Sequence, residues 1–172
     1  MMAWEPVETV EAQDEALEET QLPSLLGALA CTDVSVSEWD GRVSIHGISH
    51  ELRAEDFPAL LDQLTLVSIW GGGLGTFKVA ARVRAPSDDG EEPGSVIAYG
   101  DAMMEFHPLK LDGVHVFFLR DVPMPRPGLY TVEVLLDGYV VHAYDVAIAF
   151  DRETRDAREG QRVEIDGAEE AP

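Results

Sequence analysis

Hydrophobic and polar residues alternate along most of the chain between residues 24 and 150, and clusters of Gly, Pro, Asp and Ser interrupt the alternating stretches. Alternation with a period of two is the pattern of a β-strand that buries one face. No stretch in this region has the longer period of a core helix. The pattern therefore predicts an all-β protein, an antiparallel immunoglobulin-like or C2-like sandwich of about eight strands with acidic terminal tails.

Two of the predicted strands have especially clear patterns. Residues 64–70 form a nearly continuous apolar run of strand length, which is typical of a central strand covered on both sides. Residues 76–84 alternate, with Phe77, Val79, Ala81 and Val83 on one face. Strands are also expected at residues 25–39, 42–48, 96–106 and 114–119, and in the two runs that flank Asp137 and Gly138.

Asp137 and Gly138 predict a tight β-hairpin, because Asp-Gly pairs accept the positive φ values of a two-residue turn. A two-residue loop also determines which residues face one another. The predicted facing pairs are Val134 with Val141 and Val132 with Ala143, on a buried face shared with Tyr130 and Leu136. The apolar positions later shift to Val146, Ile148 and Phe150, so a bulge is expected near Asp145.

Asp40 and Gly41 predict a second hairpin of the same type, with Val36 facing Ile45 and Glu38 facing Val43. Extended further, this register pairs Ser35 with His46, Asp33 with Ile48 and Cys31 with His50. One face then gathers Cys31, Asp33, His46 and His50, which are residue types that could bind zinc or activate a thiol. The opposing interpretation is a small core cysteine with surface histidines, and it is favoured because no paired Cys-x-x-Cys spacing is present.

The glycine-rich segment at residues 70–74 suggests a phosphate-binding loop at first sight. Such a loop needs a following helix N-terminus and a Lys-Ser/Thr pair, whereas a β-strand follows here. A flexible hairpin loop is the better interpretation, and its large apolar side chains make it the expected contact surface for a partner. The residues of this predicted interaction loop are Trp70, Gly71, Gly72, Gly73 and Leu74.

The 172 residues include 33 acidic and 12 basic residues, for a net charge of −21. A chain this acidic repels phosphate groups, which argues against nucleic acid and anionic membranes as partners. The single cysteine excludes an internal disulfide, and the first residues contain neither the basic nor the apolar part of a secretion signal. A cytoplasmic protein without a cofactor is expected.

Acidic residues are concentrated at the two ends of the chain. The first 20 residues carry seven acidic residues and no basic one, and residues 151–172 carry eight acidic residues and four arginines. Segments of this composition contain too little apolar surface to offset the entropy of ordering. The expected organisation is an acidic arm at residues 1–22, a β-sandwich domain at residues 23–150 and a charged tail at residues 151–172.

The order of several short motifs resembles a family of small bacterial β-sandwich proteins classed as a domain of unknown function. The resemblance covers residues 30–148 and rests on the Val43–Ile48 strand, the Phe57-Pro58 pair, residues 75–79, and the segment from Pro127 into the Asp137-Gly138 turn. It implies the sandwich fold and no catalytic or cofactor residues.

No arrangement of residues in the sequence predicts a catalytic mechanism. There is no serine in a nucleophile elbow, and the many carboxylates fall in loops and tails, where solvated charges are expected. The sequence therefore predicts a non-enzymatic interaction module that binds an unknown protein partner or a second copy of itself. The alternative is a metal- or thiol-dependent enzyme, or a metal-binding protein, that uses Cys31, Asp33, His46 and His50.

Overall fold

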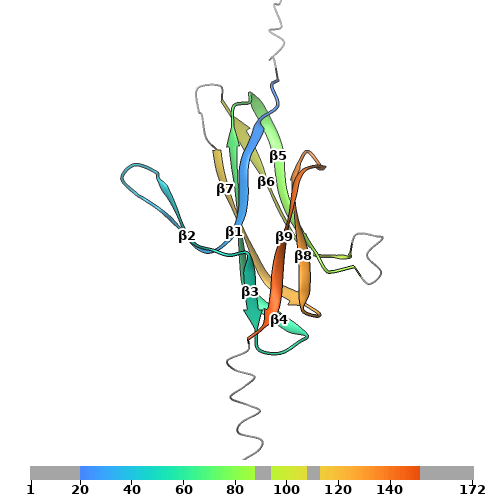
Figure 1. The fold of residues 1–172 in the computed structure, drawn as a ribbon. Coiled ribbons are helices and arrows are strands. Elements are labelled where there is room, and N and C mark those ends of the chain that lie inside the picture. Colours follow the sequence, from blue (N-terminus) through green and yellow to red (C-terminus); the bar gives the residue numbers. More distant parts are fainter. Residues whose placement is uncertain (1–19, 88–93, 108–112, 152–172) are drawn as a thin grey trace, which may run out of the picture.

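The computed structural model describes residues 20–87, 94–107 and 113–151, which contain strands and no helix (Figure 1). No helix in these ranges could therefore cross a membrane. Most of the predicted arm and tail lies outside the described residues, as does the predicted turn at Asp112. The nine strands are β1 (Ser24–Val36), β2 (Val43–Ile48), β3 (Glu51–Ala54), β4 (Ala59–Gly71), β5 (Gly75–Arg84), β6 (Val96–Phe106), β7 (Gly113–Met124), β8 (Gly128–Leu136) and β9 (Tyr139–Phe150).

The strands form two sheets that pack face to face. One sheet has four strands in the order β2-β1-β4-β7, and the other has five in the order β3-β9-β8-β5-β6. The prediction of an all-β sandwich is confirmed. The structure differs from the prediction in two respects: it has nine described strands where about eight were expected, and β3 pairs with β9 in parallel where all pairs were expected to be antiparallel.

The core lies between the sheets and is built from alternate residues of the strands. In β5, Phe77, Val79, Ala81 and Val83 are all at most 4% exposed, as the alternation predicted. β8 supplies Tyr130, Val132, Val134 and Leu136 to the same core. The large rings of Trp70 and Phe106 close one end of this core in edge-on contact.

The hairpin between β8 and β9 turns at Asp137 and Gly138, whose φ values are 48° and 87°. Its predicted register is correct only next to the turn. Val134 faces His142 while Leu135 faces Val140, so Val141 is an extra residue, and every pair further along is shifted by one. The bulge expected near Asp145 therefore occurs at Val141, and Val141 and Ala143 are exposed instead of buried.

The hairpin between β1 and β2 has a longer loop than predicted. Ser37 N donates to Arg42 O (2.8 Å) and Gly41 N donates to Ser37 O (2.9 Å), so residues 38–41 all belong to the loop. The register moves by two residues, and Val36 faces Val43. Asp40 and Gly41 are a turn as predicted, but they form only its second half.

β4 is a central strand, as the apolar run predicted, because it pairs with β1 on one side and with β7 on the other. The glycine-rich segment after it is not a hairpin loop. β4 belongs to the four-stranded sheet and β5 to the five-stranded sheet, so residues 72–74 cross between the two layers.

Candidate interaction surfaces

The predicted cluster of Cys31, Asp33, His46 and His50 does not assemble. In the observed register Asp33 faces His46 and Cys31 faces Ile48, while His50 follows the end of β2. The imidazole of His46 instead forms a hydrogen bond with Ser35 (Nε2 to Oγ, 3.1 Å). Among the residues that the structure describes, no group of three or more His, Cys, Asp and Glu side chains is placed to hold a metal ion.

Cys31 is also in a poor environment for thiol chemistry. Its side chain is only 4% exposed, and burial, followed by the negative charge of Asp33, raises the pKa of the thiol. Burial and the nearby Cys31 likewise raise the pKa of Tyr144, whose hydroxyl is buried without a hydrogen-bond partner in the described part of the chain. A nucleophilic cysteine needs the opposite, a lowered pKa and access to substrate.

The predicted interaction loop is packed into the protein. Trp70 is 1% exposed, and its indole Nε1 donates to Ser68 Oγ (2.9 Å). Gly73 lies against Pro23, because a Cβ at this position would come within 2.9 Å of the proline ring. The prediction that Trp70 contacts a partner is wrong, since this side chain already fills the end of the core.

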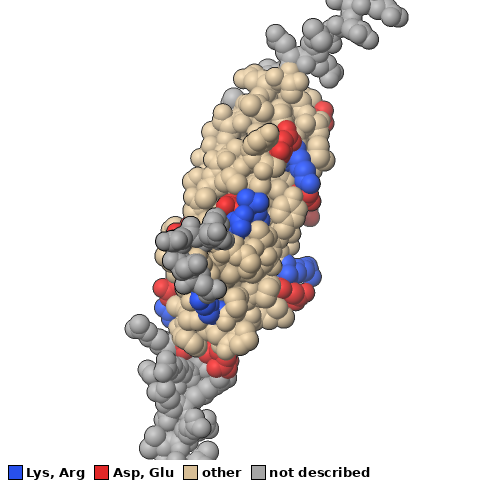
Figure 2. Space-filling model, turned by 90° about the vertical axis from the view of Figure 1, so that its right-hand side faces the viewer, with Lys and Arg blue, Asp and Glu red and all other residues tan. Residues whose placement is uncertain are grey.

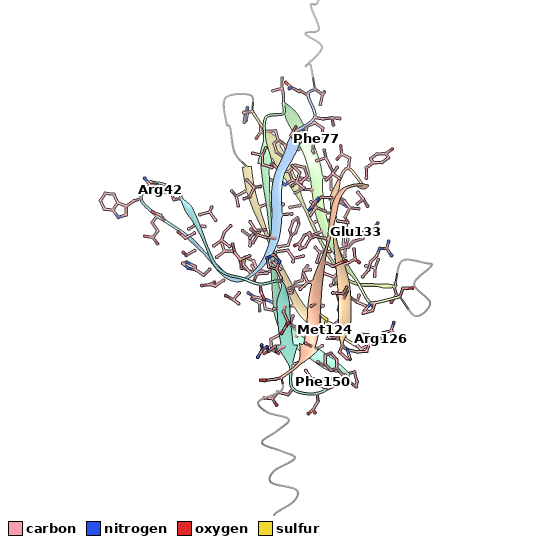
Figure 3. All side chains as sticks on the ribbon, viewed as in Figure 1. Arg42, Phe77, Met124, Arg126, Glu133 and Phe150 are labelled. Atoms are coloured by element: carbon pink, nitrogen blue, oxygen red, sulfur yellow. The ribbon has the colours of Figure 1, made fainter. Side chains whose placement is uncertain are left out.

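The outer face of the five-stranded sheet is charged, and its charges are paired. Glu133 accepts hydrogen bonds from Arg82 Nε and from Arg84 Nε (2.9 Å in the second case), and Lys78 pairs with Asp101. Burial opposes ionisation of Glu133, but the two arginines outweigh it and hold its pKa below the usual value. Figure 2 shows basic groups lying next to acidic ones on one side of the molecule, and Figure 3 labels Glu133 on β8. This face is satisfied by its own ion pairs.

The outer face of the four-stranded sheet is apolar. Val67 is 1% exposed yet lies outside the core cluster, and its neighbours across the sheet are Leu29 and Val116. Side chains at the margins are open to solvent, with Ile48 57% and Phe118 52% exposed. We call this surface the apolar face, and its members are Leu29, Cys31, Ile48, Thr65, Val67, Ile69, Val114, Val116 and Phe118.

Beyond Cys31, β1 no longer pairs with β4, and together with β2 it extends from the four-stranded sheet as a two-stranded arm, which Figure 1 shows projecting from the sandwich and Figure 3 labels at Arg42. At its tip Trp39 is 98% exposed. Val36 is 61% exposed and shares a face of the arm with Val34, Val43 and Ile45. The arm therefore exposes Trp39 and Val36, while Val34, Val43 and Ile45 are partly buried.

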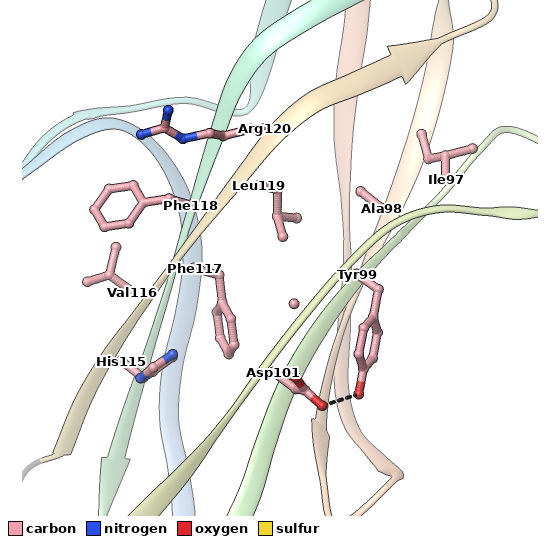
Figure 4. A pocket seen from close by; sticks show the side chains of 11 residues that line it. Ile97, Ala98, Tyr99, Asp101, His115, Val116, Phe117, Phe118, Leu119 and Arg120 are labelled. Carbon is pink, nitrogen blue, oxygen red and sulfur yellow. Dashed lines mark hydrogen bonds between the residues drawn. The ribbon is translucent and has the colours of Figure 1, made fainter.

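A cleft of about 430 Å³ lies between the edge strands β6 and β7 (Figure 4). Within it, Gly100 lets Leu119 pack against the backbone of β6, because a Cβ there would come within 3.0 Å of the leucine. His115 lies against Phe117 with ring centroids 4.4 Å apart, and burial lowers the pKa of its imidazole. The neighbouring β7 side chains Val116, Phe118 and Arg120 lie on the opposite face of β7 from Phe117 and Leu119.

The sequence identified neither the arm nor the free edge of β7 as a surface. Trp39 was expected at the end of a strand, although its position between Glu38 and Asp40 is a usable signal, since a tryptophan flanked by acidic residues at a turn cannot enter a core. Residues 114–119 were expected to form a strand, and they do. Nothing local indicates that this strand lies at a sheet edge.

A family model described as a family of unknown function (DUF6941) matches residues 26–149. The chain belongs to this family. The match runs from β1 to β9, so it covers nearly the whole sandwich. Comparison with curated proteins gives no match. Membership confirms the resemblance found in the sequence, and it assigns no catalytic or binding residue.

Proposed function

We propose that this protein is a non-enzymatic interaction module, which inserts the tip of the β1–β2 arm into an apolar recess of another protein. The observation that carries the proposal is the 98% exposure of Trp39. Tryptophan is the residue type most enriched among side chains that dominate binding energy at protein interfaces. Placed at the end of an arm, it contributes nothing to the core of its own chain.

The arm itself supports the proposal. A two-stranded hairpin without further packing is marginally stable in water. The arm holds its two strands together by pairs such as Val34 with Ile45 and Val36 with Val43, but Val36 remains 61% exposed. A partner that covers this face would bury the apolar side chains and stabilise the arm.

Charge indicates the chemistry of the partner. Glu38 and Asp40 flank Trp39, and Arg42 pairs with Asp40 (2.8 Å), which leaves the tip acidic. The complementary surface is an apolar recess with Lys or Arg at its rim, where a cation can also lie over the indole ring. The net charge of −21 supports a protein over nucleic acid or an anionic membrane.

Two further features support a non-enzymatic, cytoplasmic protein. The Cys31 thiol is buried and its pKa is raised, so this residue acts as a small apolar side chain and not as a nucleophile. The single cysteine also means that folding depends on no internal disulfide, which suits a reducing compartment.

The test is affinity capture from a lysate of the source organism with three baits, followed by binding measurements with the purified partner. The baits are the wild type, Trp39→Ser, and Tyr139→Ser, which removes a 78% exposed aromatic ring at the β8–β9 turn and is the matched control. Trp39→Ser should raise the dissociation constant of the captured partner by roughly 30-fold, which is the effect of losing a central tryptophan contact. Tyr139→Ser should leave the affinity unchanged.

The proposal fails if Trp39→Ser captures the same proteins with the same dissociation constants. It also fails if the two variants weaken binding equally. Both variants change exposed side chains, so equal melting temperatures will show that neither result reflects unfolding.

A further inference from the structure

β7 is an edge strand without the usual protection against pairing with another strand. It hydrogen-bonds to β4 along its length, and none of the described strands pairs with its other side. Natural proteins protect such edges with charges, prolines, bends or short strands. From residue 114 to residue 119 β7 has the sequence Val-His-Val-Phe-Phe-Leu, which has high β-propensity and no acidic or basic residue other than His115.

The other three edges in the described chain are protected. β3 has four residues and an Arg53–Glu51 ion pair, and β2 has six residues with Gly47 at a φ of 61°. β6 is long, but Asp101 and Glu105 lie on it. On β7 the comparable features, Asp121 with a φ of 51° and Pro123, come only after the apolar stretch.

The edge of β7 is also accessible. The cleft between β6 and β7 is lined by β7 from His115 to Arg120 and by β6 from Ile97 to Asp101, so this part of the edge borders open space and is not hydrogen-bonded to β6 (Figure 4). Burial lowers the pKa of His115, so its imidazole is neutral at physiological pH and adds no charge to the strand. The side chains of Val114, Val116 and Phe118 lie on the apolar face, directly beside this edge.

We infer that β7 pairs antiparallel with β7 of a second copy, which joins the two four-stranded sheets into one continuous sheet across a two-fold axis. Antiparallel pairing of a strand with itself is self-complementary, since each residue meets the same uncharged segment. The inference concerns a different strand from the arm and goes beyond the proposed function.

The distribution of charge favours a second copy over a basic partner. A basic protein is attracted to the acidic parts of this chain, whereas residues 114–119 carry no acidic group to attract it. Arg120 is the one Lys or Arg in the described chain for which no hydrogen bond or ion pair is found, and it lies at one end of the stretch. With the two-fold axis near Phe117, the two Arg120 residues lie about 20 Å apart, so they do not repel one another strongly.

Pairing of this kind would also extend the apolar face. The row formed by Val114, Val116 and Phe118 would continue into the same row of the second copy. Phe118 is 52% exposed in the single chain, and pairing would bury the Phe118 side chain of each copy. Burial of exposed aromatic surface and completion of backbone hydrogen bonds are what drive edge-strand association.

The experiment measures the mass of the full chain by light scattering and sedimentation, for the wild type, Phe118→Lys and Met103→Lys. Met103 is the matched control, because it is a 64% exposed apolar residue on the other long edge strand, β6. The wild type should be a dimer, and Phe118→Lys should raise the dimer dissociation constant by at least about 10-fold, since two lysines would lie near the axis. Met103→Lys should leave it unchanged.

Salt provides a second readout with a distinctive sign. Each copy carries a net charge of −21, so the copies repel one another, while the pairing strands are uncharged. Screening should therefore strengthen the dimer as the ionic strength rises. A dimer held by ion pairs would weaken instead, which would overturn the inference.

Amide exchange covers the case in which Phe118→Lys does not fold. In the wild type, exchange of the amides at residues 114–119 should slow as protein concentration rises, while amides of β6 do not change. The inference is overturned by a wild type that stays monomeric up to about 100 µM, by a dimer that Phe118→Lys leaves intact, or by equal effects of both lysine variants. It is also overturned if Trp39→Ser dissociates the dimer, since the arm would then be the interface. If Trp39→Ser loses the heterologous partner but remains a dimer, the arm and β7 are shown to be separate binding surfaces.

Discussion

Replacing Gly138 by valine tests whether the β8–β9 turn depends on a backbone conformation that only glycine accepts easily. Gly138 has a φ of 87°, and a Cβ at this position would meet nothing within 4 Å. The Cβ itself meets no neighbour, so the cost of the substitution comes from backbone strain. For an L-residue in the left-handed region the strain is about 1–2 kcal/mol, and valine is poorly tolerated there because it is branched at Cβ.

The turn also holds the sheet together, so strain at Gly138 affects more than one hairpin. Asp137 N donates to Lys78 O (2.8 Å), and Lys78 N donates to Asp137 Oδ1 (2.8 Å), which ties the turn to β5. A loss of 1–2 kcal/mol in a chain of this length should lower the melting temperature by about 2–8 °C.

Gly27→Val is the matched control in the same calorimetric or circular-dichroism melt. Gly27 lies in β1, its φ is not in the left-handed region, and a Cβ there also meets nothing within 4 Å. This variant should melt at or slightly above the wild-type temperature, because valine restricts the unfolded chain more than glycine does. If Gly138→Val melts within about 1 °C of the wild type, the strain argument is refuted.

Two further predictions follow from the core and from the ion pairs. Trp70→Ala should destabilise the protein by about 3–5 kcal/mol in denaturant titrations, because it leaves a cavity at the end of the core; a loss below about 1 kcal/mol would contradict its placement there. Glu133→Gln should cost about 2 kcal/mol at pH 7, since it leaves Arg82 and Arg84 without a carboxylate. Because these arginines lower the pKa of Glu133 in the folded state, the wild-type advantage should be complete above pH 4.5, the usual value for this carboxyl, and should disappear as pH falls through the folded-state pKa; an advantage independent of pH would show that charge is not its source.

Local periodicity was enough to predict most of the strands and, in β5 and β8, their buried faces. In β8 and β5 the alternation of apolar residues identified the core positions correctly, Val132 and Val79 among them, because side chains of a strand point to opposite faces in turn. The Asp137-Gly138 turn was equally local, since its positive φ values depend on the residues at the turn itself. These features depend only on residues that are neighbours in the sequence, so they can be predicted from the sequence.

Register and sheet order were decided by the tertiary structure. Asp40 and Gly41 are compatible with a two-residue loop or with a longer one. The structure has the longer loop, together with β1 paired to β4, and in the resulting register Cys31 faces Ile48 instead of His50. The bulge at Val141 likewise shifts the register of β9, so that Tyr144, Val146 and Ile148 contribute to the core while residues 139–143 are exposed.

Exposure was the least predictable property, because it depends on contacts between segments far apart in the chain. Trp70 and Trp39 are both aromatic residues beside a glycine-containing loop, yet the first is 1% and the second 98% exposed. The difference arises because β6 brings Phe106 against Trp70, while none of the described strands covers Trp39. In the same way, the sequence by itself determined that residues 114–119 form a strand, and only the order of strands in the sheet left one side of that strand unpaired.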